Sequence, residues 1–271
     1  MQVLILEGVE RVIGFTQMDS TVLRTLEQWF QSQLQGASEA AAASSSDVDE
    51  ANAFTLYSLA KLHFDKGTYS AGEAPARQAV EIWTRLKGGS MTAFNTLLAS
   101  LLQKQGKLEE ARPLFEENLE VSRRTLGNYH METLTSMNNL ALLLQHQSKL
   151  EYARMLFEEA LQGLRGTLGS SHPSTLTSMG NLAELLRTQG NLGEARALQE
   201  QAVEGQRRAL GPNHPDTLRS MWNLATLLQD MKHEAAAAML RECFEGRQRV
   251  LGPKHPSTIR CKIYMDERGI Q

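Results

Sequence analysis

Four histidines recur at nearly equal spacing along the chain, and histidine is a common ligand of protein-bound zinc. They are His130, His172, His214 and His255, which lie 42, 42 and 41 residues apart. A zinc site holds its ligands within about 2.0–2.3 Å of one ion, whereas residues one long period apart fall in separate loops. We therefore interpret these histidines as repeated loop-packing residues, and the sequence predicts no metal site and no cofactor.

Candidates for nucleophilic catalysis are equally few. The chain has two cysteines, Cys243 and Cys261, and neither lies in a Cys-x-x-Cys pair. A nucleophile needs a base within hydrogen-bond reach, and neither sequence context supplies one. Gly163, Gly166 and Gly169 are interpreted as a helix end, because no Gly-Lys-Ser/Thr phosphate-loop signature accompanies them. The sequence thus predicts a protein that is not an enzyme, in a reducing compartment such as the cytoplasm.

Binding chemistry has better candidates, in three asparagines at equivalent positions. Asn139, Asn181 and Asn223 each carry an amide that can donate and accept hydrogen bonds. A column of such amides suits the backbone of an extended peptide. One net hydrogen bond contributes only about 0.5–1.5 kcal/mol, so affinity would be shared among repeats. The alternative is that these asparagines cap or bridge neighbouring helices.

The elements that position these residues are pairs of helices. Met179, Leu182, Ala183 and Leu186 are spaced i, i+3, i+4 and i+7, which is one stripe of an α-helix. Equivalent stripes before and after it are Met137, Leu140, Ala141, Leu144 and Met221, Leu224, Ala225, Leu228. A polar turn follows each stripe, and a second apolar stripe follows the turn, as in Leu150, Ala153, Phe157, Ala160 and Leu161. Each unit is therefore predicted to be a helical hairpin.

The loop between hairpins has a repeated sequence, Leu-Gly-x-x-His-Pro-x-Thr-Leu over residues 168–176. Gly169 falls where a helix must end, a position that favours a left-handed residue. Pro173 falls in the first turn of the next helix, where its missing N–H costs nothing. A period near 42 residues indicates stacked supersecondary units.

These residues resemble the tetratricopeptide repeat. The resemblance lies in Asn-Leu-Ala at 139–141, 181–183 and 223–225, followed in one unit by Gly190 and Glu194-Ala195. The period and the loop resemble the long repeats of kinesin light chains and nephrocystin-like proteins, over about residues 50 to 260. The resemblance implies an all-α, right-handed solenoid of antiparallel helical hairpins.

In this repeat family the first helix of each hairpin lines a concave surface with the face opposite its buried stripe. The resemblance therefore implies peptide binding along that face. Besides the three asparagines, the residues placed there are Thr135, Leu142, His146, Thr177, Glu184, Thr188, Arg219, Thr226 and Asp230, and from the preceding unit Ala93, Leu97, Ser100 and Lys104. Their mixed charges argue against a purely acidic or basic ligand.

The resemblance also implies partners, namely other proteins or peptides, with kinesin heavy chain or motor cargo as the specific case. Residues 1–50 depart from that case, because they are too short and too broken by Gly-Ala-Ser to form the long coiled coil of kinesin light chains. The alternatives are a general scaffold of a ciliary or signalling complex and a structural repeat protein that associates with itself. Exposed repeat ends need polar caps for solubility.

Charge and hydropathy exclude other classes. The formal net charge is −3, whereas nucleic-acid-binding proteins usually have a basic excess. No apolar stretch approaches the roughly 20 residues of a membrane span. Arginine pairs near helix ends, at 123–124, 207–208 and 247–249, are interpreted as complements of the helix C-terminus. A weak nucleic-acid or acidic-lipid surface is the alternative.

The expected organisation follows the period. Residues 1–35 are predicted to be a helical cap or degenerate repeat, and 36–50 a low-complexity linker. Residues 51–88 are predicted to form a degenerate repeat. Four repeats and a truncated repeat or C-terminal cap are expected at 89–126, 127–168, 169–210, 211–251 and 252–271.

Overall fold

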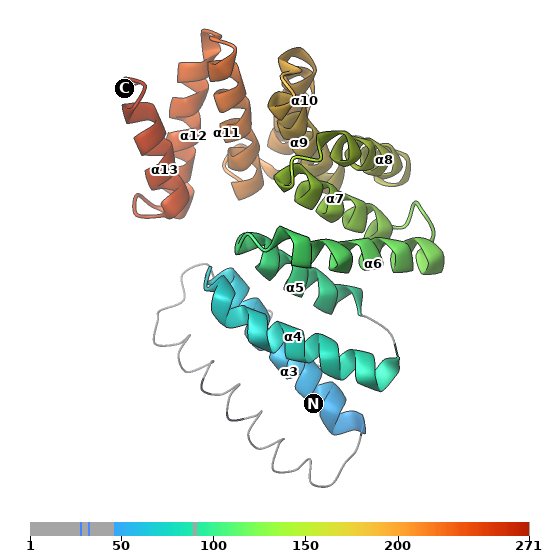
Figure 1. The fold of residues 1–271 in the computed structure, drawn as a ribbon. Coiled ribbons are helices and arrows are strands. Elements are labelled where there is room, and N and C mark those ends of the chain that lie inside the picture. Colours follow the sequence, from blue (N-terminus) through green and yellow to red (C-terminus); the bar gives the residue numbers. More distant parts are fainter. Residues whose placement is uncertain (1–27, 29–31, 33–45, 89–90, 271) are drawn as a thin grey trace. The chain divides into compact units, whose positions relative to one another are not determined.

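Antiparallel α-helices follow one another along the chain, joined by short turns (Figure 1). The computed structural model describes residues 28, 32, 46–88 and 91–270. The helices are α3 (Ser46–Asp65), α4 (Tyr69–Lys87), α5 (Thr92–Lys104), α6 (Leu108–Leu126), α7 (Met131–His146), α8 (Leu150–Leu168), α9 (Pro173–Thr188), α10 (Leu192–Leu210), α11 (Pro215–Asp230), α12 (Ala235–Leu251) and α13 (Pro256–Asp266). No strand occurs in these ranges, so the predicted all-α class is confirmed.

Contacts divide the chain into two units, residues 1–121 and 122–271, with the boundary inside α6. In the first unit α3 packs against α4, and α5 packs against both. In the second unit α7 pairs with α8, α9 with α10 and α11 with α12, and α13 packs against α12. Helix α9 also contacts α7 and α11. The first helices of successive hairpins therefore lie side by side within the second unit.

The apolar stripe of the first helices forms the core. In α9, Met179, Leu182, Ala183 and Leu186 are all buried, with at most 4% of each residue exposed. The alanine of each second helix, at 111, 153 and 195, is fully buried. Full burial of a leucine or methionine side chain contributes about 1.5–3 kcal/mol. Tertiary burial, rather than intrinsic propensity, therefore accounts for most of the stability of these helices.

A buried glycine in the second helix of three hairpins, α7–α8, α9–α10 and α11–α12, lets the two helices approach. A Cβ atom added to Gly163 in α8 would lie 2.5 Å from Cδ2 of Leu134 in α7. A Cβ atom added to Gly205 would lie at the same distance from Cδ2 of Leu176, and one added to Gly246 would lie equally close to Leu218. The sequence interpretation of Gly163 as part of a helix end is therefore wrong: it lies inside α8 and is part of the core.

The repeated loop is held by its glycine, threonine and proline. Gly169 has φ 84° and ψ 163°, which is not the left-handed helical conformation expected but a region open essentially to glycine alone. The hydroxyl of Thr175 donates to the Gly169 carbonyl at 2.9 Å. Helix α9 begins at Pro173, as predicted. The same threonine bond recurs at Thr133 and Thr217.

The loop histidines are helix N-caps, a role that sequence reasoning did not assign. The Nδ1 atom of each ring accepts a hydrogen bond from the backbone N–H two residues further on. The distances are 3.3 Å for His130, 3.1 Å for His172, 3.2 Å for His214 and 3.2 Å for His255. An accepting Nδ1 carries no proton, so these bonds fix the tautomer with the hydrogen on Nε2. Each histidine thereby satisfies one of the free N–H groups at a helix start.

We predict that His172→Ala lowers the free energy of unfolding by about 0.5–2 kcal/mol, the usual cost of losing an N-cap acceptor. His172→Asn is the matched control, because asparagine is a good N-cap and its side-chain oxygen reaches the same N–H. Urea unfolding followed by circular dichroism would measure both variants. Equal losses in the alanine and asparagine variants would contradict the capping role.

The ends of the described chain differ from expectation in detail. Helix α3 begins at Ser46, so residues 46–50 of the expected linker are helical. Apart from residues 28 and 32, the expected N-terminal cap at 1–35 lies outside the described residues. Helix α13 carries Lys262 and Asp266 at positions where α11 buries Met221 and Ala225. Charges at these positions are typical of a helix whose outer face contacts water.

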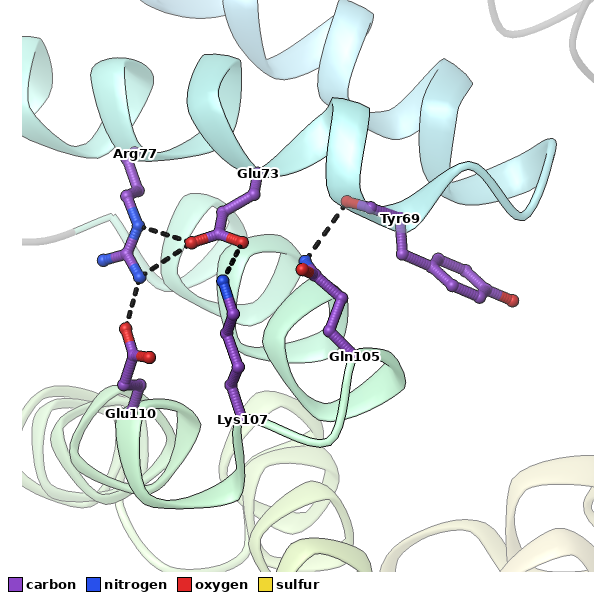
Figure 2. Close-up of polar contacts among 6 residues, drawn as sticks. All are labelled: Tyr69, Glu73, Arg77, Gln105, Lys107 and Glu110. Carbon is purple, nitrogen blue, oxygen red and sulfur yellow. Dashed lines mark hydrogen bonds and ion pairs between the residues drawn. The ribbon is translucent and has the colours of Figure 1, made fainter.

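In the first unit, an ion-pair network joins α4 to α6 and to the turn that precedes α6 (Figure 2). Glu73 accepts from Lys107 at 2.7 Å and pairs with Arg77 at 2.9 Å. Arg77 also pairs with Glu110, and the Gln105 amide donates to the Tyr69 carbonyl at 3.3 Å. The second helices of the next three hairpins have this i, i+4 pair in the opposite order: Arg112–Glu116, Arg154–Glu158 and Arg196–Glu200. The reversal at α4 turns the carboxylate toward Lys107.

The hydrogen bond from Lys107 lowers the pKa of the Glu73 carboxyl; burial opposes this, and Arg77 adds to the lowering. A carboxyl with a lowered pKa in the folded state stabilises the fold above its unfolded pKa, and this contribution is lost as pH falls. We therefore predict that Glu73→Gln loses less stability than wild type between pH 7 and about pH 3, by up to about 1 kcal/mol. Urea unfolding at several pH values would test this. A Glu73→Gln variant whose stability falls with pH as steeply as that of the wild type would contradict the prediction.

Candidate peptide-binding surface

The candidate surface is the face of α7, α9 and α11 that carries Asn139, Asn181 and Asn223; we call it the asparagine face. All three asparagines are half-buried, on the side of their helices away from the buried stripe. Because α9 contacts both α7 and α11, the three positions fall on adjacent helices of one unit. The repeat thus places chemically equal groups in a row.

The three amides have no hydrogen-bond partner among the residues that the structure describes. In α7 the neighbouring residue Asn138 bridges two helices, and its Nδ2 donates to the Leu134 carbonyl at 2.9 Å. Its Oδ1 accepts from the Ser178 hydroxyl at 3.1 Å, which joins α7 to α9. The geometry therefore leaves the amides of the asparagine face open to an external donor and acceptor.

A charged cluster lies beside the asparagines on α9 and α11. The Arg187 guanidinium donates to Asp230 at 2.7 Å and to Glu184 at 2.9 Å. Arg187 was missed in the sequence, although its i+3 spacing from Glu184 was a usable signal. These exposed pairs contribute at most about 1 kcal/mol each, so a ligand can displace them at little cost.

The remaining predicted residues are placed unequally. Thr135, His146, Thr188 and Arg219 are exposed, and Leu142 and Thr177 are half-buried. Arg219 pairs with Asp216 at 3.1 Å. Thr226 is only 7% exposed, and its hydroxyl donates to the Asn223 carbonyl at 3.0 Å, so it offers little to a ligand. Lys104 is exposed and belongs to the first unit, as do half-buried Ala93 and Ser100 and buried Leu97.

An aromatic residue of α13, Tyr264, continues the row, and sequence reasoning did not place it there. Tyr264 lies 41 residues after Asn223, which makes it the equivalent position of α13. Its ring meets that of Trp222 edge-to-face at 5.0 Å. The Arg268 guanidinium lies 3.6 Å from the Tyr264 ring centre. The period alone could have identified Tyr264, because the loop at 251–259 fixes its register.

The arginines near helix ends are not free basic spots. Arg123 pairs with Glu159 at 2.8 Å and Arg207 with Glu242 at 2.7 Å, so each joins the second helices of adjacent hairpins. Arg247, which the sequence placed with them, is only 7% exposed. Most of this charge is therefore used within the fold.

Over the described ranges, no cluster of three or more histidine, cysteine or acidic residues could hold a metal ion. Nor does any helix described here have the length and apolar character needed to cross a membrane.

Comparison with known proteins agrees with this architecture. A family model described as tetratricopeptide repeat matches residues 89–165, 135–208 and 174–249. The crystal structure of BtubC (BKLC) from P. vanneervenii is similar, with TM-score 0.67 and 20% identity over 86% of this chain and 94% of that one. The apo quorum sensor NprR from B. thuringiensis has TM-score 0.67 and 10% identity, covering 91% of this chain and 67% of that one. Both likenesses show the fold alone.

A third structure is more similar in sequence. It is a protein of Podosopora anserina described as a kinesin light chain with nearly identical TPR-like repeats, with TM-score 0.59 and 28% identity. The match covers 72% of this chain and 94% of that one. A search of curated protein sequences finds no match. The helical hairpins thus form a solenoid, a fold that typically serves as a non-catalytic scaffold binding other proteins.

The family model spans more than half of the chain, and it falls on the hairpins whose loops, caps and buried stripes repeat. The chain belongs to the tetratricopeptide repeat family, and its repeats are similar to those of the Podosopora anserina protein.

Proposed function

We propose that this chain is a non-catalytic interaction scaffold that binds an extended peptide segment of a partner protein on the asparagine face. The observation that supports this most is the set of three equivalent, half-buried amides without partners in the described part of the chain. An amide can donate to a peptide carbonyl and accept from a peptide N–H. Three amides on adjacent helices can therefore hold an extended backbone with little dependence on its side chains.

Side chains of the partner would meet the groups beside the asparagines. Leu142 offers an apolar contact on α7, and the Glu184–Arg187–Asp230 cluster offers both charges on α9 and α11. Since each net hydrogen bond contributes only about 0.5–1.5 kcal/mol, we expect modest affinity built from several repeats. The two free cysteines fit a reducing compartment, and we place the activity in the cytoplasm.

The test is an affinity purification from native extract with the wild type and the triple variant Asn139→Ala, Asn181→Ala, Asn223→Ala. The matched control replaces three exposed residues at one equivalent position of the second helices, Gln162, Glu204 and Glu245, by alanine. The proposal expects the partner to be retained by the wild type and the control and lost by the folded asparagine variant. Equal retention by all three proteins would place the binding site elsewhere.

The finer role is that of a cargo adaptor for a microtubule motor. Its support is the similarity to repeats described as those of a kinesin light chain. Recovery of motor heavy chain or of a defined cargo in the same purification would favour this role. Recovery of ciliary or signalling proteins without a motor would favour a general scaffold instead.

Self-assembly is the second candidate, and one observation favours it. Helix α13 exposes Ile259 and Ile263, at 45% and 51%. Lys262 and Asp266 on the same helix oppose close apolar stacking, because their charges would have to be desolvated. Light scattering over a range of concentrations separates the candidates: a constant monomer mass excludes self-assembly.

A further inference from the structure

Most histidines of this chain hold the start of a helix through the same ring nitrogen. Besides the four loop histidines, His233 accepts with Nδ1 from the backbone N–H of Ala235, the first residue of α12, at 3.2 Å. The sequence has seven histidines, and five of them therefore accept a backbone N–H with Nδ1. One chemical state, the ring with an unprotonated Nδ1, is used at the starts of α7, α9, α11, α12 and α13.

Histidine differs from the usual capping residues in its response to acid. Asparagine, aspartate, serine and threonine are the preferred N-caps, and their oxygen atoms accept hydrogen bonds throughout the range from about pH 8 to 5. Histidine takes up a proton within that range, and both nitrogens of the protonated ring are donors. An Nδ1–H would then face a backbone N–H, and a positive ring would lie at the positive end of a helix dipole. Protonation therefore turns a stabilising contact into a repulsive one.

A carboxylate lies close to one of these rings, that of His214. Oδ2 of Asp216 is 3.7 Å from its Nδ1, and a carboxylate at that place compensates a protonated ring in part. Asp216 also pairs with Arg219 at 3.1 Å. From the neighbouring α12, Arg249 donates to Oδ1 of Asn213, the residue before His214, at 3.2 Å. His214 is thus a cap that acid weakens only in part.

The other four rings lack such a partner. In the described part of the chain, no carboxylate pairs with them. At His255, Arg247 of α12 donates to the Ser257 carbonyl at 3.0 Å, so a cation already lies near that cap. His172 has no charged residue within two positions on either side, whereas the charged residues at such positions beside the remaining rings are Glu132, Lys232, Glu234 and Lys254. His172 is therefore the cap on which acid acts with the least interference.

We propose that these five histidines form a pH-sensitive switch, which holds the helix starts at about pH 7.5 and releases them at about pH 5.5. A folded state that needs the unprotonated ring binds fewer protons than the unfolded chain, so stability falls as the pH falls. Loss of one N-cap acceptor lowers the equilibrium constant for folding by about 2- to 30-fold, and the repeat multiplies this effect. Helices α7, α9 and α11 carry the asparagine face, so acid loosens the helices that bear it.

The first test reads the ring nitrogens directly. Long-range proton–nitrogen NMR spectra of the imidazole rings at pH 7.5 distinguish a hydrogen on Nε2 from one on Nδ1. We expect the hydrogen on Nε2 in all five capping rings, which are His130, His172, His214, His233 and His255. A majority of these rings with the hydrogen on Nδ1 would overturn the proposal, because such rings cannot accept the backbone N–H.

The second test compares the wild type with a variant in which all five capping histidines are replaced by asparagine, which accepts at either pH. Both proteins keep His63 and His146, so the titration of these residues is common to the two. Urea unfolding followed by circular dichroism at pH 7.5 and 5.5 gives the folding equilibrium constants. Between these pH values, we expect the constant of the wild type to fall at least about tenfold more than that of the variant. Equal falls would overturn the proposal.

Single variants keep the test decisive even if the fivefold variant does not fold. His172→Asn should reduce the loss of stability at pH 5.5 more than His214→Asn does, because Asp216 already compensates the ring of His214. A His172→Asn variant that loses as much stability as the wild type would overturn the proposal. The outcome does not depend on the ligand of the asparagine face.

Discussion

Gly163→Ala is expected to lower the free energy of unfolding by about 1–3 kcal/mol, the usual cost of overpacking a core. Alanine is normally the better helix former, by about 0.5–1 kcal/mol, so a loss would reverse the ordinary sign. The reason is that the new Cβ would lie 2.5 Å from Cδ2 and 3.2 Å from Cδ1 of Leu134. Both methyl groups are in the way, and Leu134 is fully buried.

The control lies one turn away in the same helix. Gly166 of α8 has no atom within 4 Å of an added Cβ, and Gly166→Ala should raise stability by about 0.5–1 kcal/mol. Urea unfolding followed by circular dichroism would measure both variants. Stabilisation by Gly163→Ala would show that α7 and α8 can move apart without cost, and would contradict the close approach described for all three hairpins.

The second large effect is a gain. Gln206 of α10 is fully buried, and neither its Oε1 nor its Nε2 has a partner within the described chain. Leaving a buried polar group unsatisfied costs about 1–3 kcal/mol. The equivalent residue one repeat earlier is Leu164, which is also buried. Gln206→Leu should therefore raise the free energy of unfolding by about 1–3 kcal/mol.

Two further variants test this explanation. Leu164→Gln, the reciprocal change in α8, should lower stability by a similar amount. Gln199→Leu in α10 should gain less than Gln206→Leu, because the Gln199 amide donates to the Ser220 carbonyl at 3.0 Å and that acceptor would lose its partner. Thermal unfolding of the three variants would rank them. A neutral or destabilising Gln206→Leu would show that the amide is satisfied in solution, for example by a buried water.

Much of the fold could be predicted from the sequence, because it depends on local patterns. The spacing of Met179, Leu182, Ala183 and Leu186 gave the buried face of α9, and Pro173 gave its first residue. These signals lie within one helix and one loop. Repetition strengthened these local signals, because a pattern that occurs four times does not arise by chance.

Features that depend on contacts between helices were not predictable. Gly163 is required by Leu134 on another helix, and no local pattern distinguishes it from exposed Gly166. The capping by His172 depends on its Nδ1 atom facing the start of α9. The orientation of the ring cannot be read from the sequence. Arg247 resembled the surface arginines before it, and only the packing of Trp222 shows why it is buried.

The asparagine face could be predicted in part. The period placed Asn139, Asn181 and Asn223 on equivalent positions, and helical geometry placed them opposite the buried stripe. Whether their amides were already bonded within the fold depended on neighbours such as Asn138 and Ser178. The structure describes that neighbourhood, and the binding role remains our proposal.

The most direct measurement is site-specific photo-crosslinking to the recovered partner. A photoreactive residue would replace Thr177, which is half-buried one turn from Asn181 on the same face, or exposed Glu204 on α10. If the asparagine face binds the partner, the probe at 177 cross-links to it and the probe at 204 does not. Cross-linking from 204 with none from 177 would contradict the proposed site.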